Sequence, residues 1–452
     1  MTHTNPTSGL FTDLYQLTMA QAYWRSRKTA DATFSLFFRG YPPDRGYFVF
    51  AGLPGVVDHL EGFGFSDEDI EFLGTLGQFD AEFLAYLREF RFTGRLRAMT
   101  EGAIFFAGEP VIEVTAPVIE GQLLETALLN LVSAPVLLAT KASRLVHAAR
   151  GRTVVDFAAR RTHGVDISVK LARACYMVGF AGTSNVLAGK LHGIPTSGTM
   201  AHSFVTTFES ELDAFKAYAQ TFPGSTTLLV DTYDTLEGTR NAIRVAHEME
   251  RQGHALRAIR LDSGDLSDLS PKCRAMLDEA GLHGVQIFAS GGLDEFEVDR
   301  LLRNGAPIDG FGIGTRLGVS ADAPTTDCVY KLVEYNGRPV LKLSPGKQTL
   351  PGRKQVFRSR DGAGGYRRDI ITLDGEPSPE KLAEPLLSDV IADGRRLGPD
   401  PSLEQLRTQF AREFASLPDL YKSLRSPERY DVIHSKLLNQ LGSSVARQAG
   451  KS

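Results

Sequence analysis

The sequence predicts an α/β protein in which an irregular barrel of parallel strands interrupts a second, discontinuous domain. From Thr153 onward, short β-branched and aromatic runs alternate with longer segments of helical periodicity. This alternation is typical of parallel strands joined by right-handed helical crossovers. Before residue 120 and after Val319 the alternation is missing, and strand-like and helix-like segments follow one another irregularly. Two kinds of domain are therefore expected in one chain.

Residues 1–119 are expected to form an amino-terminal α+β domain. The predicted elements are a helix at 12–22 with Thr12 as its N-cap, strands at 34–38 and 47–50, amphipathic helices at 67–73 and 80–87, and a hairpin within 103–118 that turns at 108–110.

Residues 120–324 are expected to form the barrel, which would carry the catalytic site. Segment 123–149 is apolar with helical periodicity, contains Pro135, and must be buried over much of its length. After it, strands are predicted at 153–158, 226–231, 256–262, 285–290 and 309–314, and helices at 167–180, 209–222, 236–252, 266–280 and 293–304. Because fewer than eight strand–helix pairs are clear, a distorted or incomplete barrel is predicted rather than a regular one.

Residues 325–395 are expected to return to the first domain. Strands at 329–334 and 339–343 flank a Tyr-Asn-Gly-Arg turn, and strands at 358–361 and 365–371 form a second predicted hairpin. Residues 396–452 are expected to form a helical carboxy-terminal tail, with apolar residues on one face of its first helix: Leu403, Leu406, Phe410, Phe414 and Leu417.

Composition limits the classes of protein that fit. The chain has 452 residues, 42% of them hydrophobic, and a net charge of −4, which argues against broad nucleic-acid binding. Three cysteines without a CxxC pair support neither a zinc site nor a disulfide framework. The amino-terminal residues do not resemble a signal peptide, and no membrane span is predicted. A cytoplasmic location is therefore expected.

Glycines follow two consecutive predicted strands. The first strand ends in Ser290-Gly291-Gly292 and the second in Gly314-Thr315. Glycine lets a phosphate approach the backbone closely, and the helix that follows favours an anion at its amino end. Each glycine turn by itself is equally compatible with a simple tight turn, but two of them on late strands favour a phosphate site.

Charged side chains stand at other predicted strand ends. Arg160 and Arg161 follow the first strand of the series, and IRLDSGDL places Arg260, Asp262 and Asp265 at a later one. The two aspartates are suited to the water ligands of Mg²⁺ or to ribose hydroxyls, although Asp265 is equally placed to cap the next helix. Asp231 and Asp234 likewise either orient a neighbouring group or cap a helix.

His202 lies among small residues in SGTMAHSFV, just before a predicted helix. A single histidine is more often structural than catalytic. Its place in a series of functional strand ends favours a catalytic role here.

These segments together resemble nicotinate phosphoribosyltransferase, from Gly9 to about Arg358. The matching motifs, in the order of the family, are GLFTDLYQLTMAQAY, FFRGYPPDRGYFVFAGL, DFAARRTHG, AGTSNVLAG, GTMAHSFV, VDTYDTLEG, IRLDSGDL, ASGGLDE and KLSPGKQTLPGRKQVFR.

The resemblance implies an ATP-assisted transfer of phosphoribose from 5-phosphoribosyl-1-pyrophosphate to nicotinate, with Mg²⁺. Nicotinate mononucleotide and pyrophosphate would be the products, in the first step of NAD salvage from nicotinate, and ATP would be hydrolysed to ADP and phosphate. It also implies an α/β sandwich domain, an irregular seven-stranded barrel, and a homodimer with shared active sites.

The resemblance also implies roles for individual residues. His202 would be phosphorylated by ATP, and Phe157 would stack on the pyridine ring with Tyr15 of a neighbouring subunit. The remaining expected site residues are Arg160, Arg161 and Arg260 for pyrophosphate and carboxylate, Asp262 and Asp265 for the metal, Gly291, Gly292, Gly314 and Thr315 for the 5′-phosphate, and Lys342, Lys347 and Lys354 for ATP or pyrophosphate.

Two positions depart from related patterns. Nicotinamide-specific enzymes carry an aspartate where this chain has Ser184, and a hydroxyl can donate to a carboxylate that an aspartate would repel. This difference favours nicotinate. The family usually has glycine where this chain has Ala158, a change that would narrow the ring pocket.

Three other interpretations remain open. A nicotinamide or quinolinate phosphoribosyltransferase would share the fold, but Ser184 argues against the first, and chain length with GTMAHS against the second. A sugar-phosphate lyase or isomerase leaves the paired arginines unexplained. A non-catalytic scaffold requires the loss of catalytic groups that are all present.

Overall fold

The computed structural model describes residues 8–344 and 349–449 and divides into two compact units. Unit 1 comprises Met1–Leu137 with Thr325–Ser452, and unit 2 comprises Leu138–Pro324. The boundary between them lies within the long helix α6 (Glu125–Ala148), whereas the sequence predicts it at residue 120.

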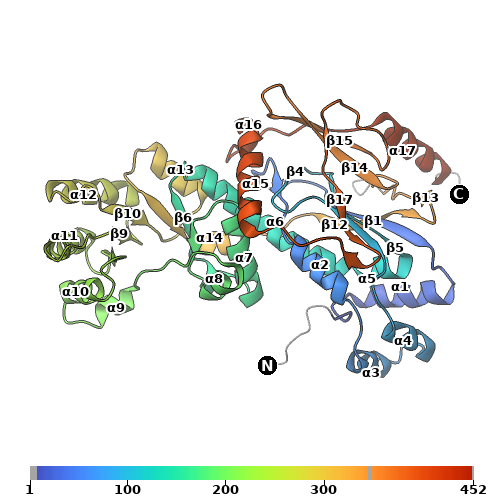
Figure 1. The fold of residues 1–452 in the computed structure, drawn as a ribbon, viewed down its shortest axis with the longest axis horizontal. Helices are drawn as coiled ribbons and strands as arrows, with labels where there is room; N and C mark the ends of the chain where they lie inside the picture. Colours follow the sequence, from blue (N-terminus) through green and yellow to red (C-terminus); the bar gives the residue numbers. More distant parts are fainter. Residues whose placement is uncertain (1–7, 345–348, 450–452) are drawn as a thin grey trace. The chain divides into compact units, whose positions relative to one another are not determined.

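Unit 1 is built on a seven-stranded sheet in the order β13-β12-β1-β5-β3-β17-β18 (Figure 1). Its central strands pair antiparallel, with β1 between β5 and β12. The strands are β1 (Asp31–Phe38), β3 (Arg95–Ala98), β5 (Pro110–Pro117), β12 (Cys328–Tyr335), β13 (Arg338–Pro339), β17 (Ser388–Ala392) and β18 (Arg395–Arg396).

Helices cover this sheet, and the apolar core between them is built from residues of both the strands and the helices. Phe34, Leu36 and Phe38 of β1 are almost completely buried in that core. The helices of the amino-terminal part are α1 (Leu14–Arg25), α2 (Leu53–Gly62), α3 (Asp67–Thr75), α4 (Ala81–Arg88) and α5 (Val118–Leu123). Helix α1 begins after Asp13 and not after the predicted cap Thr12.

The predicted hairpin within 103–118 is wrong. Both strands form, but β4 (Ile104–Phe105) pairs with β2 (Phe48–Val49), and β5 pairs with β1 and β3. The turn at Gly108 therefore redirects the chain between two sheets. The predicted hairpin of β14 (Lys354–Arg360) with β15 (Tyr366–Leu373) is confirmed. That of β12 with β13 forms around the predicted turn, but the strand predicted at 339–343 ends at Pro339.

A four-stranded sheet completes unit 1, in the order β16-β14-β15-β19. Its strands are β14 (Lys354–Arg360), β15 (Tyr366–Leu373), β16 (Glu384–Pro385) and β19 (Val432–His434), and the helices of this region are α15 (Leu403–Ser416), α16 (Asp419–Lys422) and α17 (Lys436–Ala449). The carboxy-terminal segment is therefore not purely helical, because β19 joins β15 in parallel.

A buried ion pair fixes this second sheet to the first part of the chain. Arg358 donates to both carboxylate oxygens of Asp369, with Nη2 2.5 Å from Oδ2, and also to the carbonyl of Ile104 at 2.9 Å. Its guanidinium lies over the rings of Tyr366 and Phe106. Burial beside Asp369 raises the pKa of Glu109. The charge of Arg358 is therefore what allows carboxylates to lie inside the unit.

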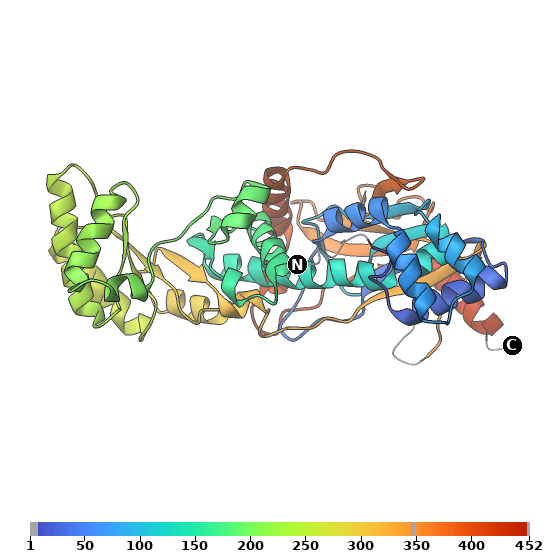
Figure 2. The ribbon, with the colours of Figure 1, turned by 90° about the horizontal axis from the view of Figure 1, so that it is seen from below.

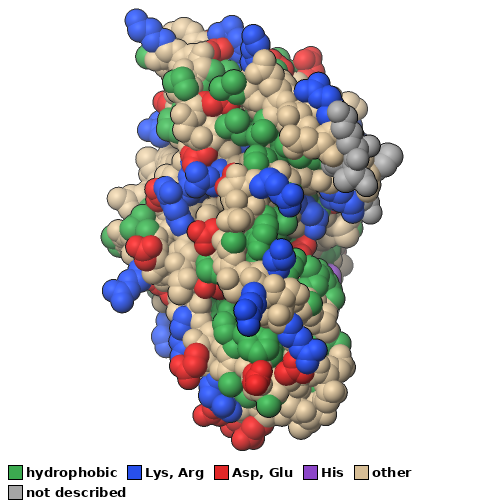
Figure 3. Space-filling view, turned by 90° about the vertical axis from the view of Figure 1, so that its right-hand side faces the viewer, with side chains coloured by type: hydrophobic (Ala, Val, Ile, Leu, Met, Phe, Trp, Pro, Cys, Tyr) green, Lys and Arg blue, Asp and Glu red, His purple; other side chains and the backbone are tan. Residues whose placement is uncertain are grey.

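The face of unit 1 in Figure 3 carries basic and acidic side chains interspersed with apolar ones. This mixture agrees with the small net charge of the sequence.

Helix α6 is long and apolar enough to span a membrane by length and composition, whereas the sequence predicts no membrane span. However, 61% of its most apolar window is buried inside the protein. Its polar face carries Lys141 and Arg144, which both pair with the buried Glu295. These features fit a core helix, as the prediction of burial for 123–149 required.

Unit 2 contains a six-stranded parallel sheet in the order β7-β6-β11-β10-β9-β8. The strands are β6 (Thr153–Asp156), β7 (Gly182–Thr183), β8 (Thr227–Leu229), β9 (Ala258–Leu261), β10 (Gln286–Ala289) and β11 (Gly310–Ile313). The five strands predicted from the sequence all form. The two-residue β7 was missed, because it is too short to show a pattern.

Helices follow these strands, as the alternation predicted. They are η1 (Ala159–Arg161), α7 (Val165–Met177), α8 (Val186–His192), α9 (His202–Thr206), α10 (Glu211–Thr221), α11 (Thr235–Arg251), α12 (Leu266–Glu279), α13 (Glu295–Arg303) and α14 (Thr315–Gly318). Helices α10, α11 and α12 pack side by side, with α11 against β9 and α12 against β10 (Figures 1 and 2).

Within the described residues the sheet of unit 2 has six strands, and no pairing joins β8 to β7. An isolated parallel bridge between Thr183 and Thr196 adds an extended segment beside β7. The sheet is thus a parallel half-barrel, and a closed seven-stranded barrel stays a prediction.

Replacing Arg358 with leucine should lower the free energy of unfolding by about 3–5 kcal/mol, because the Asp369 carboxylate would stay buried without its partner. The single tryptophan, Trp24, lies in α1, so its fluorescence during urea unfolding follows unit 1. Arg95→Leu is the matched control: Arg95 bonds Asp389 at the surface, where a pair contributes about 0–1 kcal/mol. Equal effects of both variants would contradict this account of Arg358.

Candidate active site

The carboxyl ends of the strands in unit 2 gather the polar side chains of the candidate site. Because the strands are parallel, their carboxyl ends share one edge of the sheet, where ligands bind in α/β proteins.

At the end of β6, Asp156 organises the backbone from beneath. Its buried carboxylate accepts from the hydroxyl of Thr183 at 2.6 Å and from the backbone N–H of Ala158 at 2.8 Å. Burial raises the pKa of Asp156, and these two hydrogen bonds oppose that shift. Ala158 has ordinary helical dihedrals and is fully buried against Gly318, so its methyl group fits without strain.

Phe157 directly follows Asp156, and its ring packs against the backbone of Gly312, a residue without a side chain. A Cβ at Gly312 of β11 would lie 2.4 Å from the Phe157 ring, so the ring occupies the space that a side chain would fill. Phe288 of β10 packs nearby, with 6.1 Å between ring centroids. Arg160 and Arg161 follow in η1, and both are exposed. Neither guanidinium bonds to another residue that the structure describes.

Ser184 and Asn185 follow β7 and have different roles. The side chain of Asn185 caps α8 through the N–H of Ala188 and donates to the hydroxyl of Ser168. The backbone N–H of Ser184 donates to the carbonyl of Asp156 at 2.7 Å. Its hydroxyl has no hydrogen bond within 8–344 and 349–449, which leaves it available for a ligand.

Carboxylates brace the ends of β8, β9 and β10. Oδ2 of Asp231 accepts from the N–H of Asp262 at 3.1 Å and from the hydroxyl of Ser263 at 2.5 Å. Oδ1 of Asp262 accepts from the hydroxyl of Ser290 at 2.5 Å. The other oxygen of Asp231 is buried and has no hydrogen-bond partner among the described residues. A buried acceptor of this kind is suited to a ligand.

Arg260 is the partly buried cation of the site, with 12% of its side chain exposed. Its Nη1 donates to the hydroxyl of Thr199 at 2.6 Å, and its Nη2 lies 3.9 Å from Oδ1 of Asp262. Burial lowers the pKa of Arg260, and Arg160 adds to that shift, whereas Asp262 and Asp231 oppose it. Its Nε is buried and has no acceptor in the part of the chain that the structure describes, so the guanidinium retains a donor for an anion.

His202 begins α9 and reaches two of these loops. Its Nδ1 lies 3.1 Å from the hydroxyl of Thr232, and its Nε2 lies 3.9 Å from Oδ2 of Asp262. The side chain is 43% exposed, so one side of the ring is accessible.

The glycines after β10 and β11 stand where the sequence predicted. A Cβ on Gly291 would lie 1.8 Å from the carbonyl oxygen of Asp262, so this turn packs directly on the neighbouring strand end. Gly292 faces open space. After β11, Gly314 precedes α14, whose first residue is Thr315.

Asp265 caps α12, accepting from the N–H of Ser267 at 2.9 Å. Asp234 similarly caps α11, while Asp231 orients the end of β9. Of the two roles predicted for Asp231 and Asp234, Asp231 therefore orients a neighbouring group and Asp234 caps a helix.

Four predicted residues belong to unit 1. Tyr15 lies on α1 and is 49% exposed. Lys347 lies outside the described residues. Lys342 and Lys354 line a cavity of about 620 Å³ in unit 1.

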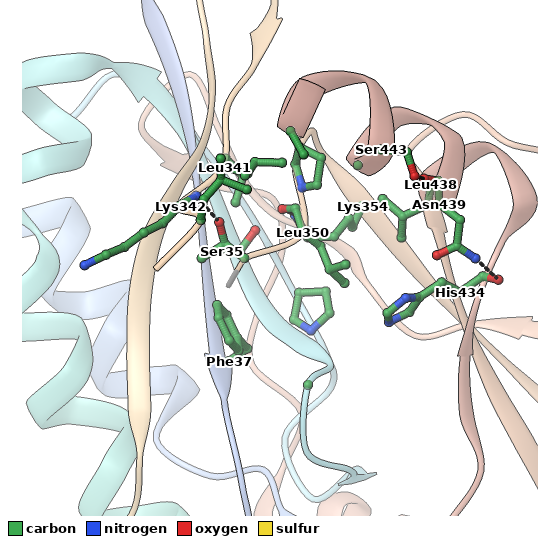
Figure 4. Close-up of a pocket in the computed structure, with 18 of the residues that line it drawn as sticks. Ser35, Phe37, Leu341, Lys342, Leu350, Lys354, His434, Leu438, Asn439 and Ser443 are labelled. Carbon is green, nitrogen blue, oxygen red and sulfur yellow. Dashed lines mark hydrogen bonds between the residues drawn. The ribbon is translucent and has the colours of Figure 1, made fainter. Parts of the chain in front are cut away.

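Figure 4 shows the two lysines of this cavity in different orientations. The side chain of Lys342 points away from the cavity. Nζ of Lys354 donates to the carbonyl of Gly352 at 2.6 Å and lies 3.3 Å from Glu113. The buried ammonium of Lys354 is thus already engaged within unit 1.

Sequence reasoning missed several polar residues of the site. They are Asp156, Thr183, Thr199, Thr232 and Ser290, and Asp231 was noted without being chosen. Each of them forms a hydrogen bond with a residue distant in the sequence. Their positions at or after predicted strands are therefore the only feature of the sequence that could have indicated a role in the site.

Gly291→Ala should lower the free energy of unfolding of unit 2 by about 3 kcal/mol, through overpacking against Asp262 and left-handed strain. Gly292→Ala is the matched control: it also has positive φ but open space, so about 1 kcal/mol is expected. Urea unfolding followed by circular dichroism measures both variants. Equal losses would show that the close approach to Asp262 is not the constraint.

Comparisons with known proteins agree over most of the chain. The model of the nicotinate phosphoribosyltransferase (NAPRTase) N-terminal domain matches residues 10–133, and that of the NAPRTase family matches 153–411. A nicotinate phosphoribosyltransferase of Mycobacterium tuberculosis is 50% identical over 92% of this chain and 89% of its own length. That of Bacillus subtilis is 46% identical over 94% of this chain and 92% of its own length.

Solved structures give the same result. Human nicotinic acid phosphoribosyltransferase superposes with a TM-score of 0.87 at 32% identity, covering 96% of this chain and 99% of the human chain. A nicotinate-nucleotide pyrophosphorylase from Pyrococcus furiosus gives a TM-score of 0.75 at 25% identity, covering 90% and 95%. This chain therefore belongs to the nicotinate phosphoribosyltransferase family of enzymes.

Proposed function

We propose that the chain transfers phosphoribose from 5-phosphoribosyl-1-pyrophosphate to nicotinate, with ATP hydrolysis through a phosphorylated His202. The products are nicotinate mononucleotide, pyrophosphate, ADP and phosphate, and the reaction opens NAD synthesis from nicotinate. One observation carries the proposal: Arg260, Asp262 and His202 meet at one sheet edge, beside the glycine turn at Gly291.

The ring of nicotinate is proposed to bind against Phe157. The ring of Phe157 packs closely against the backbone at Gly312, which limits its movement and suits it to stacking. The hydroxyl of Ser184, which has no hydrogen bond within the described residues, and the exposed guanidinium of Arg160 are proposed to bind the carboxylate of nicotinate, because both can donate hydrogen bonds. Arg161 is a further cation for this carboxylate or for pyrophosphate.

Breaking the bond to pyrophosphate places positive charge on the ribose and negative charge on the leaving group. Arg260 has an Nε–H donor without an acceptor among the described residues and is oriented by its hydrogen bond to Thr199, so it is suited to the leaving group. Gly291, Gly292, Gly314 and Thr315 are proposed to bind the 5′-phosphate through the backbone.

Mg²⁺ fits this edge as an ion that arrives with the substrate. The described residues contain no cluster of three or more potential metal ligands. Mg²⁺ needs only one or two carboxylates when phosphates and waters supply the rest. Asp262 and the unpartnered oxygen of Asp231 provide these, and Asp265 retains one oxygen for a water ligand. The ion would neutralise charge on pyrophosphate.

A homodimer with shared active sites is part of the proposal. Helix α1 and the turn before it expose Phe11, Leu14 and Tyr15, each by 45% or more. Such a cluster is suited to cover by another subunit. Tyr15 of one subunit would then stack on the ring bound by its partner. Lys342 is a candidate for ATP or pyrophosphate, whereas the carbonyls around Lys354 make a structural role the better supported one. A cytoplasmic location also remains proposed.

Product formation should require nicotinate rather than nicotinamide and should be raised by ATP. His202→Ala should keep the fold and lose the stimulation by ATP, because no imidazole remains to accept phosphate. The measurement is mononucleotide formed from each base with 5-phosphoribosyl-1-pyrophosphate and Mg²⁺, with and without ATP. His247→Ala, an exposed histidine paired with Glu250 on α11, is the matched control. Full stimulation in His202→Ala would refute the phosphohistidine role.

Ser184→Asp should raise the KM for nicotinate about tenfold or more, because two carboxylates would meet in the ring pocket. Ser184→Asn is the neutral control and should raise it far less. Steady-state kinetics with nicotinate and nicotinamide measures both. An unchanged KM in the aspartate variant would remove Ser184 from the base pocket and reopen the nicotinamide assignment.

A further inference from the structure

The imidazole of His202 is held from one side by a single side chain of another loop. Thr232 follows β8, and its hydroxyl lies 3.1 Å from Nδ1 of His202. On the other side, Nε2 lies 3.9 Å from Asp262, beyond hydrogen-bond distance. Thr232 is therefore the direct hydrogen-bond partner of the ring in the described structure.

The segment of His202 offers little restraint of its own. Helix α9 has five residues, and its N-cap, Ala201, makes no side-chain hydrogen bond. The histidine side chain is 43% exposed, and rotation about its χ2 bond has broad minima. Without an external partner the ring would sample several orientations.

The loop that carries Thr232 is anchored on both sides. Asp231, directly before it, binds the N–H of Asp262 and the hydroxyl of Ser263. Asp234, two residues later, accepts from two backbone N–H groups at the start of α11. Thr232 is thus a fixed point against which a mobile ring can be oriented.

We propose that Thr232 is a positioning residue for the ATP-driven step, in which its hydroxyl orients the imidazole of His202 toward the γ-phosphate. This inference rests on the proposed phosphohistidine role. In that step a ring nitrogen uses its lone pair to form an N–P bond, and the P–O bond to ADP breaks with its electron pair leaving on ADP. Water later cleaves the N–P bond, which releases phosphate and restores the imidazole.

Thr232→Val tests the inference, since it keeps the shape of the side chain and removes the hydroxyl. We expect labelling of His202 by γ-labelled ATP in a single turnover to slow about 5- to 10-fold, the loss of one hydrogen bond. The KM for ATP should stay within about twofold, because Thr232 acts on orientation rather than on binding.

Two further variants separate the hydroxyl from packing. Thr232→Ser keeps a hydroxyl and should recover most of the labelling rate. Thr206→Val is the matched control within α9, because the Thr206 hydroxyl bonds the carbonyl of Ser203, and it should label at the parent rate. Circular dichroism checks the fold of each variant, and Thr232→Ala replaces the valine variant if that one does not fold.

The outcomes distinguish this inference from the function on which it rests. Parent-like labelling in Thr232→Val would overturn the role of Thr232 and leave the phosphohistidine intact. Equal losses in Thr232→Ser and Thr232→Val would also overturn it, since packing would then be the cause. Absence of label on His202 in the parent protein would overturn both the phosphohistidine role and the positioning role of Thr232. The parent protein is measured first, so this outcome is known before any variant is compared.

Discussion

The candidate site depends on the hydrogen bonds that the Asp231 carboxylate makes to the end of β9. Parallel strands bring their ends to one edge, but they do not by themselves fix the loops that follow. Asp231 binds both the backbone and a side chain of the next strand end, and Asp262 continues this contact to Ser290. Three successive loops are thus coupled through carboxylates, and Arg260 lies among these groups. A rigid arrangement of this kind is what transition-state stabilisation of charge requires.

The sequence predicted the parallel half of the fold well, since each buried strand there is a compact apolar run with a helix after it. It failed where pairing depends on distant partners. The segments around Phe105 and Val111 form strands, yet they join different neighbours, because residues far away in the chain compete for their edges. The very short β7 also escaped, because hydrogen bonds to β6 define it rather than its own composition.

Prediction of the site shows the same difference between local patterns, which the sequence reveals, and contacts with distant residues, which it does not. Residues with unusual local chemistry, such as His202 and the glycines after β10, can be found in the sequence. Thr232 and Ser290 have no such signal, since a hydroxyl becomes informative only when its partner is known. Lys354 illustrates the opposite case: its motif suggested a phosphate ligand, whereas burial lowers its pKa and backbone carbonyls bind its ammonium group.

The pairing of β1 with β12 has a consequence for biosynthesis. Ala32 of β1 lies opposite Tyr335 of β12, and all of unit 2 lies between these two strands in the sequence. Strand β12 is therefore synthesised, and can pair with β1, only after the whole of unit 2. Unit 2 is continuous and built from local crossovers, so it can fold first during translation. Meanwhile one edge of β1 stays unpaired and open to strands of other chains. Slow translation beyond residue 324 would prolong that interval, and chaperones that shield strand edges would be most useful to the nascent chain there.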